Sequence, residues 1–108
     1  MAAWQFRYYS PKVQAAIEAW PPGILAGFQR IARVMLEHGP DLGMPHTRAM
    51  GGGLFEVRAK GREGIGRAFY CIVAGQGIVI LHAFTKKTEQ TPTRELATAR
   101  ARLKEVKL

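Results

Sequence analysis

The stretch Gly51–Pro92, GGGLFEVRAKGREGIGRAFYCIVAGQGIVILHAFTKKTEQTP, decides the fold of this chain. Apolar and polar residues alternate over Phe55–Lys60, few polar positions interrupt Arg67–Val73, and Ile78–Phe84 is the most hydrophobic run. The turn sequences GREG and AGQG separate the three runs. Because such runs bounded by turn residues are typical of strands, we predict three consecutive antiparallel strands with Ile78–Phe84 at the centre of the sheet.

The residues before this stretch predict one more strand and two helices. Trp4–Tyr8 alternates at period two, which indicates a half-buried strand. Ser10 and Pro11 suit the N-cap and first position of a helix whose apolar spacing runs to Trp20. After Pro21-Pro22 a second apolar stripe predicts a helix over Gly23–Glu37, so that the two helices form a hairpin across one face of the sheet.

Two further segments complete the predicted layout. Residues 41–53, DLGMPHTRAMGGG, are expected to form a loop. Thr91 and Pro92 are expected to start a last helix with an apolar seam formed by Leu96, Ala99, Leu103 and Val106. The predicted order is therefore β-α-α-β-β-β-α, a single α+β domain over residues 1–108 with a small antiparallel meander sheet, an N-terminal helical hairpin on one face and a C-terminal helix.

The charge of the chain is its least ordinary bulk property. The 108 residues are 47% hydrophobic and 22% charged, which is typical of a globular domain, but the net charge is +8. From Arg48 onward there are twelve basic and five acidic residues, so +7 of the +8 lies in the second half. Such a basic domain favours an anionic partner, either nucleic acid or an acidic protein, and the alternative is a charge that serves solubility alone.

The cysteine and histidine content argues against disulfides and metals. Cys71, the one cysteine, lies inside a predicted strand, so the chain suits the reducing cytoplasm. The three histidines show no metal-ligand spacing, and there is no signal-peptide-like N-terminus or membrane-spanning apolar run. We therefore expect a cytoplasmic protein with no metal, no cofactor and no membrane association.

A set of cations lies along the predicted strands. If the turn between them is tight, Arg58 and Arg67 are neighbours across the ladder. His82, Phe84 and Lys86 share one side of the last strand. Together with nearby residues these side chains could bind single-stranded RNA, because cations bind phosphates and aromatic rings stack on bases. The RNA-binding candidates are Lys60, Tyr70, Phe84 and Lys87, and the catalytic candidates are Arg58, Arg67, Lys86 and His82.

The same residues could also cleave RNA without a metal. The ribose 2′-OH would attack the adjacent phosphorus, with Lys or His moving protons and arginine stabilising the extra negative charge. Each residue also has a structural alternative. Arg58 could form a salt bridge with Glu56 or Glu63, His82 could be a satisfied core histidine, and Lys86-Lys87 could be a solvated strand exit.

Three motifs resemble the phage-derived HigB-type branch of the RelE/ParE toxin superfamily. They are GLFEVR at 53–58, RAFY at 67–70 and ILHAFTKKT at 80–88, followed by Pro92. The similarity covers residues 51–99 closely, and the first fifty residues match in layout alone. The resemblance implies a RelE-like fold and the toxin of a type II toxin–antitoxin pair that cuts mRNA on the ribosome by metal-free 2′-OH attack.

The resemblance also implies partners and site residues. A small helix-turn-helix antitoxin would neutralise the toxin, Arg58 and Arg67 would bind phosphate, and Lys86 would stand at the strand exit. The chain has no Tyr or His after Lys86, so the resemblance assigns no general base or acid. Two other functions remain open: a ParE-like poison of DNA gyrase, and a non-enzymatic module that binds RNA or protein.

Overall fold

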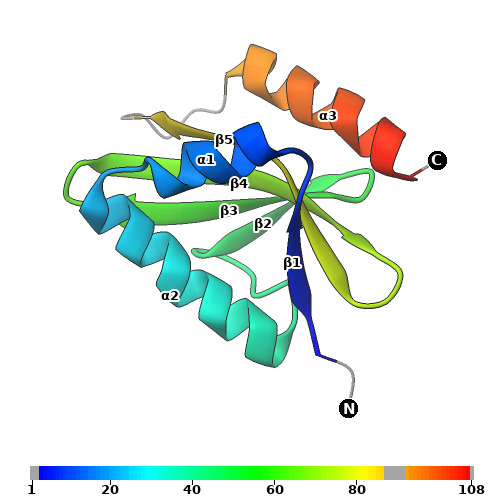
Figure 1. The fold of residues 1–108 in the computed structure, drawn as a ribbon, viewed down its shortest axis with the longest axis horizontal. Coiled ribbons are helices and arrows are strands. Elements are labelled where there is room, and N and C mark those ends of the chain that lie inside the picture. The colour runs from blue at the N-terminus through cyan, green and yellow to red at the C-terminus, as the bar shows by residue number, and fades with distance from the viewer. Residues whose placement is uncertain (1–2, 87–91, 108) are drawn as a thin grey trace.

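The computed structural model describes residues 3–86 and 92–107 of the chain. One strand is followed by two helices, four strands and a last helix, and this arrangement confirms the predicted α+β class (Figure 1). In order they are β1 (Gln5–Tyr8), α1 (Pro11–Glu18), α2 (Pro22–His38), β2 (Thr47–Gly51), β3 (Leu54–Gly61), β4 (Gly64–Val73), β5 (Gly77–Lys86) and α3 (Thr93–Lys107).

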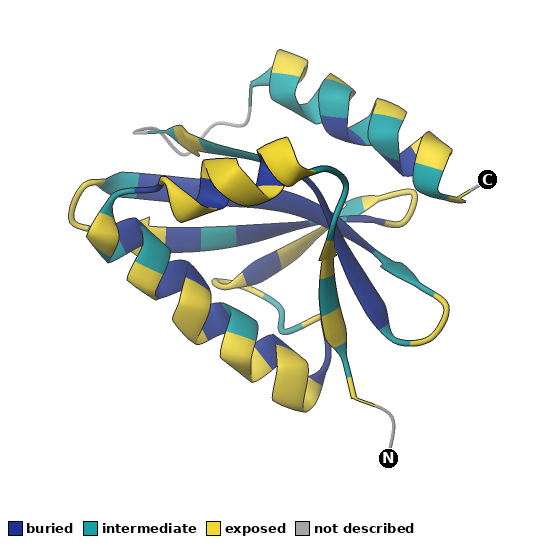
Figure 2. Ribbon diagram, viewed as in Figure 1, coloured by how far each residue is buried: buried dark blue, intermediate teal, exposed yellow. Residues whose placement is uncertain are grey.

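The sheet has five strands in the order β1-β5-β4-β3-β2. Strands β2 to β5 form an antiparallel meander, and β1 returns to pair parallel with β5. The prediction that Ile78–Phe84 is the central strand is wrong, because β1 covers one edge of β5 and β2 extends the sheet beyond β3. The central strand is β4, which is buried over Ile65–Cys71 and is dark blue along most of its length in Figure 2.

The loop expected over residues 41–53 contains a strand that the sequence pattern does not show. Strand β2 lies at the edge of the sheet and pairs Thr47 with Val57 and Arg48 with Glu56. Its burial does not alternate, because Thr47 is buried whereas Arg48 and Ala49 are both exposed. An edge strand of this kind is held by backbone hydrogen bonds to a single neighbour, so it needs no apolar face that periodicity could reveal.

Two hydrophobic clusters cover the two faces of the sheet. The larger cluster joins α1 and α2 to one face through residues such as Ile17, Phe28 and Tyr70. The smaller cluster joins α3 to the other face, where Ala99 and Leu103 pack against Phe69 and Leu81. The predicted helical hairpin and the predicted apolar seam of the last helix are therefore confirmed, whereas the proposed cap Thr91 lies outside the described residues.

The starts of the two N-terminal helices are capped in different ways. Ser10 caps α1 as predicted, since its hydroxyl accepts a hydrogen bond from the Val13 N–H at 3.4 Å. Helix α2 has no side-chain cap of its own, and Glu63 in the β3–β4 turn accepts the Gly23 N–H at 3.0 Å instead. This hydrogen bond lowers the pKa of the Glu63 carboxyl below its ordinary value of 4.5, because it stabilises the ionised form. The contact ties the β3–β4 turn to the helix.

We expect Glu63→Gln to lower the midpoint of thermal unfolding at pH 7, because an amide oxygen is a weaker partner for a helix N-terminus than a carboxylate. The folded-state pKa of Glu63 is depressed, so its contribution is present above pH 4.5 and is lost as the pH falls through the lower folded-state pKa. The difference between the two proteins should therefore shrink in that acidic window. Thermal unfolding followed by circular dichroism at several pH values measures this, and Glu37→Gln, an exposed carboxylate at the other end of α2, is the control.

Candidate nucleic-acid interface

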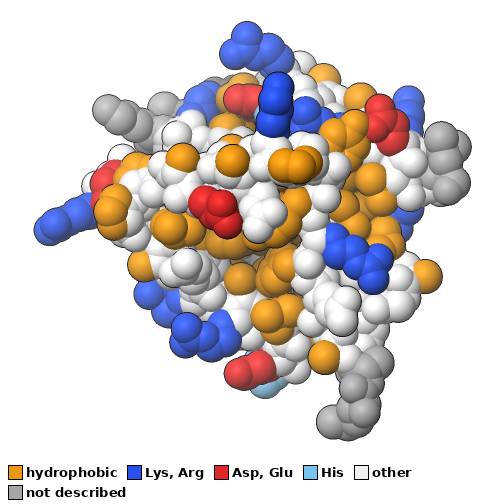
Figure 3. Space-filling view, viewed as in Figure 1, with side chains coloured by type: hydrophobic (Ala, Val, Ile, Leu, Met, Phe, Trp, Pro, Cys, Tyr) orange, Lys and Arg blue, Asp and Glu red, His pale blue; other side chains and the backbone are white. Residues whose placement is uncertain are grey.

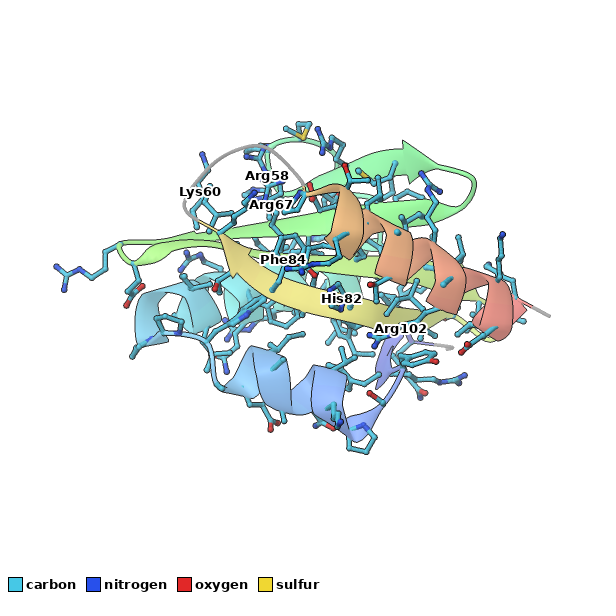
Figure 4. The ribbon with its side chains drawn as sticks, turned by 90° about the horizontal axis from the view of Figure 1, so that it is seen from above. Arg58, Lys60, Arg67, His82, Phe84 and Arg102 are labelled. Atoms are coloured by element: carbon cyan, nitrogen blue, oxygen red, sulfur yellow. The ribbon has the colours of Figure 1, made fainter. Side chains whose placement is uncertain are left out.

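Arg58 and Arg67 are directly paired across the ladder between β3 and β4. Side chains of a directly opposed antiparallel pair point to the same face of the sheet, so the two arginines share one face. It is the face that α3 covers, because Phe69, two positions from Arg67 on β4, packs with the residues of α3. Arg67 is in turn opposite Phe84 on β5. Figure 4 shows Arg58 and Arg67 side by side near the N-terminal end of α3, with Phe84 next to them. The tight Arg62-Glu63 turn produces this register, and the predicted proximity of the two arginines is confirmed.

Arg67 is fully buried and forms an ion pair with a buried carboxylate. The Arg67 Nη1 atom lies 3.2 Å from Glu56 Oε2, and both side chains have 0% exposure. The second Glu56 oxygen lies 3.4 Å from Nη2 of Arg48, whose side chain is 42% exposed. Burying an ionised group is costly unless an opposite charge compensates it, so Glu56 is a structural requirement for Arg67. The positive charge of Arg67 on β4 is therefore partly neutralised by Glu56 on β3 before any ligand binds.

His82 is held by two residues of α3. Its Nε2 atom lies 2.7 Å from Glu95 Oε1, and its Nδ1 atom lies 3.4 Å from Arg102 Nη1. Because a guanidinium can donate but not accept, the Arg102 contact favours the tautomer in which Nε2–H donates to Glu95. The imidazole also stacks on Phe84, with ring centroids 5.9 Å apart. Three side chains, those of Glu95, Arg102 and Phe84, therefore set the orientation of the His82 ring.

Sequence reasoning missed Glu95 and Arg102 as partners of His82. They lie seven residues apart, which places them on one side of α3, beside the apolar seam. Arg102 also donates to the Leu81 carbonyl at 2.8 Å and lies 4.6 Å from the centroid of the Tyr9 ring. The seven-residue spacing of Glu95 and Arg102 could be recognised in the sequence. The bulge in β5 that places His82 on the face covered by α3 could not.

The remaining predicted residues occupy different surroundings. Lys60 is exposed two positions beyond Arg58, and Lys86 is half-buried opposite Ile65 at the end of β5. Tyr70 is fully buried on the α1/α2 face, where its hydroxyl donates to the Pro40 carbonyl. Burial raises the pKa of the Tyr70 hydroxyl. The structure therefore does not bring Tyr70 to the surface that carries Arg58, and Lys87 lies outside the described residues.

Metal and membrane signatures are absent from the part of the chain that the structure describes. Within residues 3–86 and 92–107, no group of three or more His, Cys, Asp or Glu side chains could hold a metal ion. None of the helices in these ranges is long and apolar enough to span a membrane. The groups that the interface provides for chemistry are arginines, lysines, a histidine–glutamate pair and an aromatic ring.

These features define a class of small basic α+β domain in which one sheet face carries cations and an oriented histidine. The chain matches the family model described as Phage derived protein Gp49-like (DUF891) over residues 15–104, and it belongs to that family. The match contains Arg58, Arg67, His82 and both α3 partners of His82. A comparison with curated proteins finds no match to the chain.

Proposed function

We propose that this protein is the toxin of a type II toxin–antitoxin system and acts as a ribosome-dependent mRNA endonuclease. The observation that carries the proposal is the direct pairing of Arg58 with Arg67 on one sheet face, with Phe84 opposite Arg67. His82, oriented by Glu95, stacks on the same phenylalanine. Cations, a stacking ring and a proton-transfer group therefore occupy adjacent positions. The resemblance to HigB-type toxins in these same strands supports this reading.

The proposed reaction is an attack of the ribose 2′-oxygen on the adjacent phosphorus. The new 2′-O–P bond forms as the P–O5′ bond breaks, which leaves a 2′,3′-cyclic phosphate and a 5′-hydroxyl. Arg58 and Arg67 would stabilise the charge that develops on the phosphoryl oxygens, and Phe84 would stack on a base. His82 would exchange the proton of the 2′-oxygen or of the leaving 5′-oxygen, and Lys86 would add positive charge at the end of β5.

The proposed partners follow from the charge of the chain. The messenger RNA is presented by the ribosome, and a helix-turn-helix antitoxin neutralises the toxin in the cytoplasm. Since +7 of the net +8 lies from Arg48 onward, the antitoxin should present acidic side chains to this half and cover Arg58 and Arg67.

One observation favours a second candidate, a non-enzymatic module that binds RNA or an acidic protein. Arg67 has no exposed surface and is ion-paired with Glu56, so in this conformation the guanidinium is not presented to a ligand in solution. In a binding module the exposed cations would dock a partner, and the Arg67–Glu56 pair would serve stability alone.

Induction of the chain in bacteria that lack its partner gene distinguishes these functions. The endonuclease should arrest growth and produce new mRNA 5′ ends that carry a hydroxyl and map within translated reading frames. Growth arrest with intact mRNA and an induced DNA-damage response would instead indicate a gyrase poison. Cells that grow normally, with no new 5′ ends, would support the binding module and contradict the toxin proposal.

A further inference from the structure

Two adjoining pockets lie between α2, the loop before β2 and the part of β3 that extends beyond its pairing with β2, next to the interface described above. The first, with a volume of about 170 Å³, is lined by the cationic residues Arg30, Arg58 and Lys60 together with His46. The second, of about 240 Å³, is lined by Ile31, Val34 and Leu42 and shares Arg30, Ile31 and His46 with the first. We refer to them as the cationic pocket and the apolar pocket.

Backbone contacts hold the walls of these pockets in place. Helix α2 lies close to β3, since a Cβ atom at Gly27 would stand 2.8 Å from the Lys60 carbonyl oxygen. The loop before β2 is fixed to the β3 edge, because the Arg58 N–H donates to the His46 carbonyl at 2.9 Å. The Gly43 carbonyl accepts the N–H groups of His46 and Thr47, which closes the turn that presents His46. The site is therefore built from a helix, a strand and a tied loop.

The charge and polarity of the two pockets are complementary to a nucleotide. Among the described residues, those lining either pocket include no carboxylate, so the cationic pocket suits an anion. Arg30 and His46 stand at the boundary with the apolar pocket, and guanidinium and imidazole planes both stack on bases. Figure 3 shows Lys and Arg side chains beside α2 at the lower left of the molecule. The arrangement offers a phosphate site next to an apolar slot.

Continuity with the strand arginines selects RNA as the occupant. Arg58 lines the cationic pocket and is also the cross-strand partner of Arg67. We propose that the two pockets bind one nucleotide of a single-stranded RNA, with its phosphate in the cationic pocket and its base in the apolar pocket. The RNA then passes from the face that carries Arg67 around the end of β3 that extends beyond β2, and reaches α2. This inference rests on the proposed function for the identity of the strand, and it adds a second nucleotide subsite.

The phosphate half is tested with Arg30→Ala, and Arg33→Ala is a matched control. Both arginines are exposed on α2, but Arg33 lines neither pocket. Binding of a fluorescein-labelled 12-nucleotide oligouridine is measured by fluorescence anisotropy at several salt concentrations. We expect Arg30→Ala to weaken binding roughly five- to tenfold and to lower the salt slope by about one, and Arg33→Ala to match the unmodified chain.

The base half is tested with Val34→Asp, and Leu36→Asp is a matched control. Both residues are 39% exposed on α2, and Leu36 lines neither pocket. The two substitutions change the net charge equally, so a general electrostatic effect would weaken both variants alike. We expect Val34→Asp to weaken oligouridine binding and to abolish its preference over an abasic strand of the same length, whereas Leu36→Asp keeps that preference.

The outcomes separate this inference from the proposed endonuclease. A protein that produces no new mRNA 5′ ends but shows the Arg30 and Val34 effects contradicts the nuclease and supports the subsite. If the chain cleaves mRNA but the Arg30→Ala and Arg33→Ala variants bind oligouridine equally well, the proposed nucleotide subsite is wrong and the proposed endonuclease is not affected. If Arg30→Ala leaves oligouridine binding unchanged but weakens binding of an acidic peptide with an apolar side chain, the pockets are a protein-docking surface and the inference is wrong.

Discussion

Replacing Arg58 with alanine is expected to lower the rate of mRNA cleavage by roughly 100- to 1,000-fold, the range found when one preorganised donor to a developing oxyanion is removed. Arg58 is half-buried on β3 directly opposite Arg67, so its guanidinium is held by the strand rather than by a flexible loop. A donor held in this way requires little reorganisation when charge develops on the phosphate.

The measurement is the rate of cleavage of ribosome-bound mRNA by the purified chain, with the fold of each variant checked by circular dichroism. Arg58→Lys keeps the charge but loses the planar fork, so an intermediate rate is expected. Arg62→Ala removes an exposed arginine from the β3–β4 turn and should leave the rate unchanged. An Arg58→Ala variant that is folded and cleaves at the original rate would remove Arg58 from the mechanism.

Replacing Glu56 with alanine is expected to lower the free energy of unfolding by about 3–5 kcal/mol, the cost of removing one partner of a buried ion pair. The reason is that Glu56 and Arg67 are both fully buried, with Nη1 and Oε2 3.2 Å apart. Arg48, whose side chain is 42% exposed, also loses its contact with Glu56 but can be solvated. Urea unfolding at pH 7 measures the change, which should appear as a lower midpoint at an unchanged slope.

The double variant Glu56→Leu/Arg67→Met provides the control. Apolar residues of similar volume in place of a buried ion pair are often neutral or stabilising, so most of the lost free energy should return. This folded protein without the Arg67 guanidinium then separates the two roles of Arg67. A loss of cleavage supports a role for Arg67 in the reaction, whereas full cleavage assigns it to stability alone. A double variant as unstable as Glu56→Ala would contradict the account of the buried pair.

The fold could be predicted largely from local patterns. Ser10-Pro11 marks the start of α1, and the period-two alternation of Phe55–Lys60 marks β3. The two-residue turn between Gly61 and Gly64 also determines which residues of β3 and β4 face each other, so the pairing of Arg58 with Arg67 could be predicted. These features depend on residues that are close together in the chain, and short-range sterics and hydrophobic periodicity are sufficient to specify them.

Other features were decided by contacts between distant parts of the chain. The parallel return of β1 beside β5 makes β4 central, and the backbone of β3 makes a strand of Thr47–Gly51. The docking of α3 brings Glu95 to His82, thirteen positions away, and the approach of α2 to β3 forms the two pockets at the sheet edge. The sequence alone determined the helices, the three consecutive strands β3, β4 and β5 and the facing arginines. The tertiary structure alone decided the burial and partners of these side chains, because burial depends on which elements pack together.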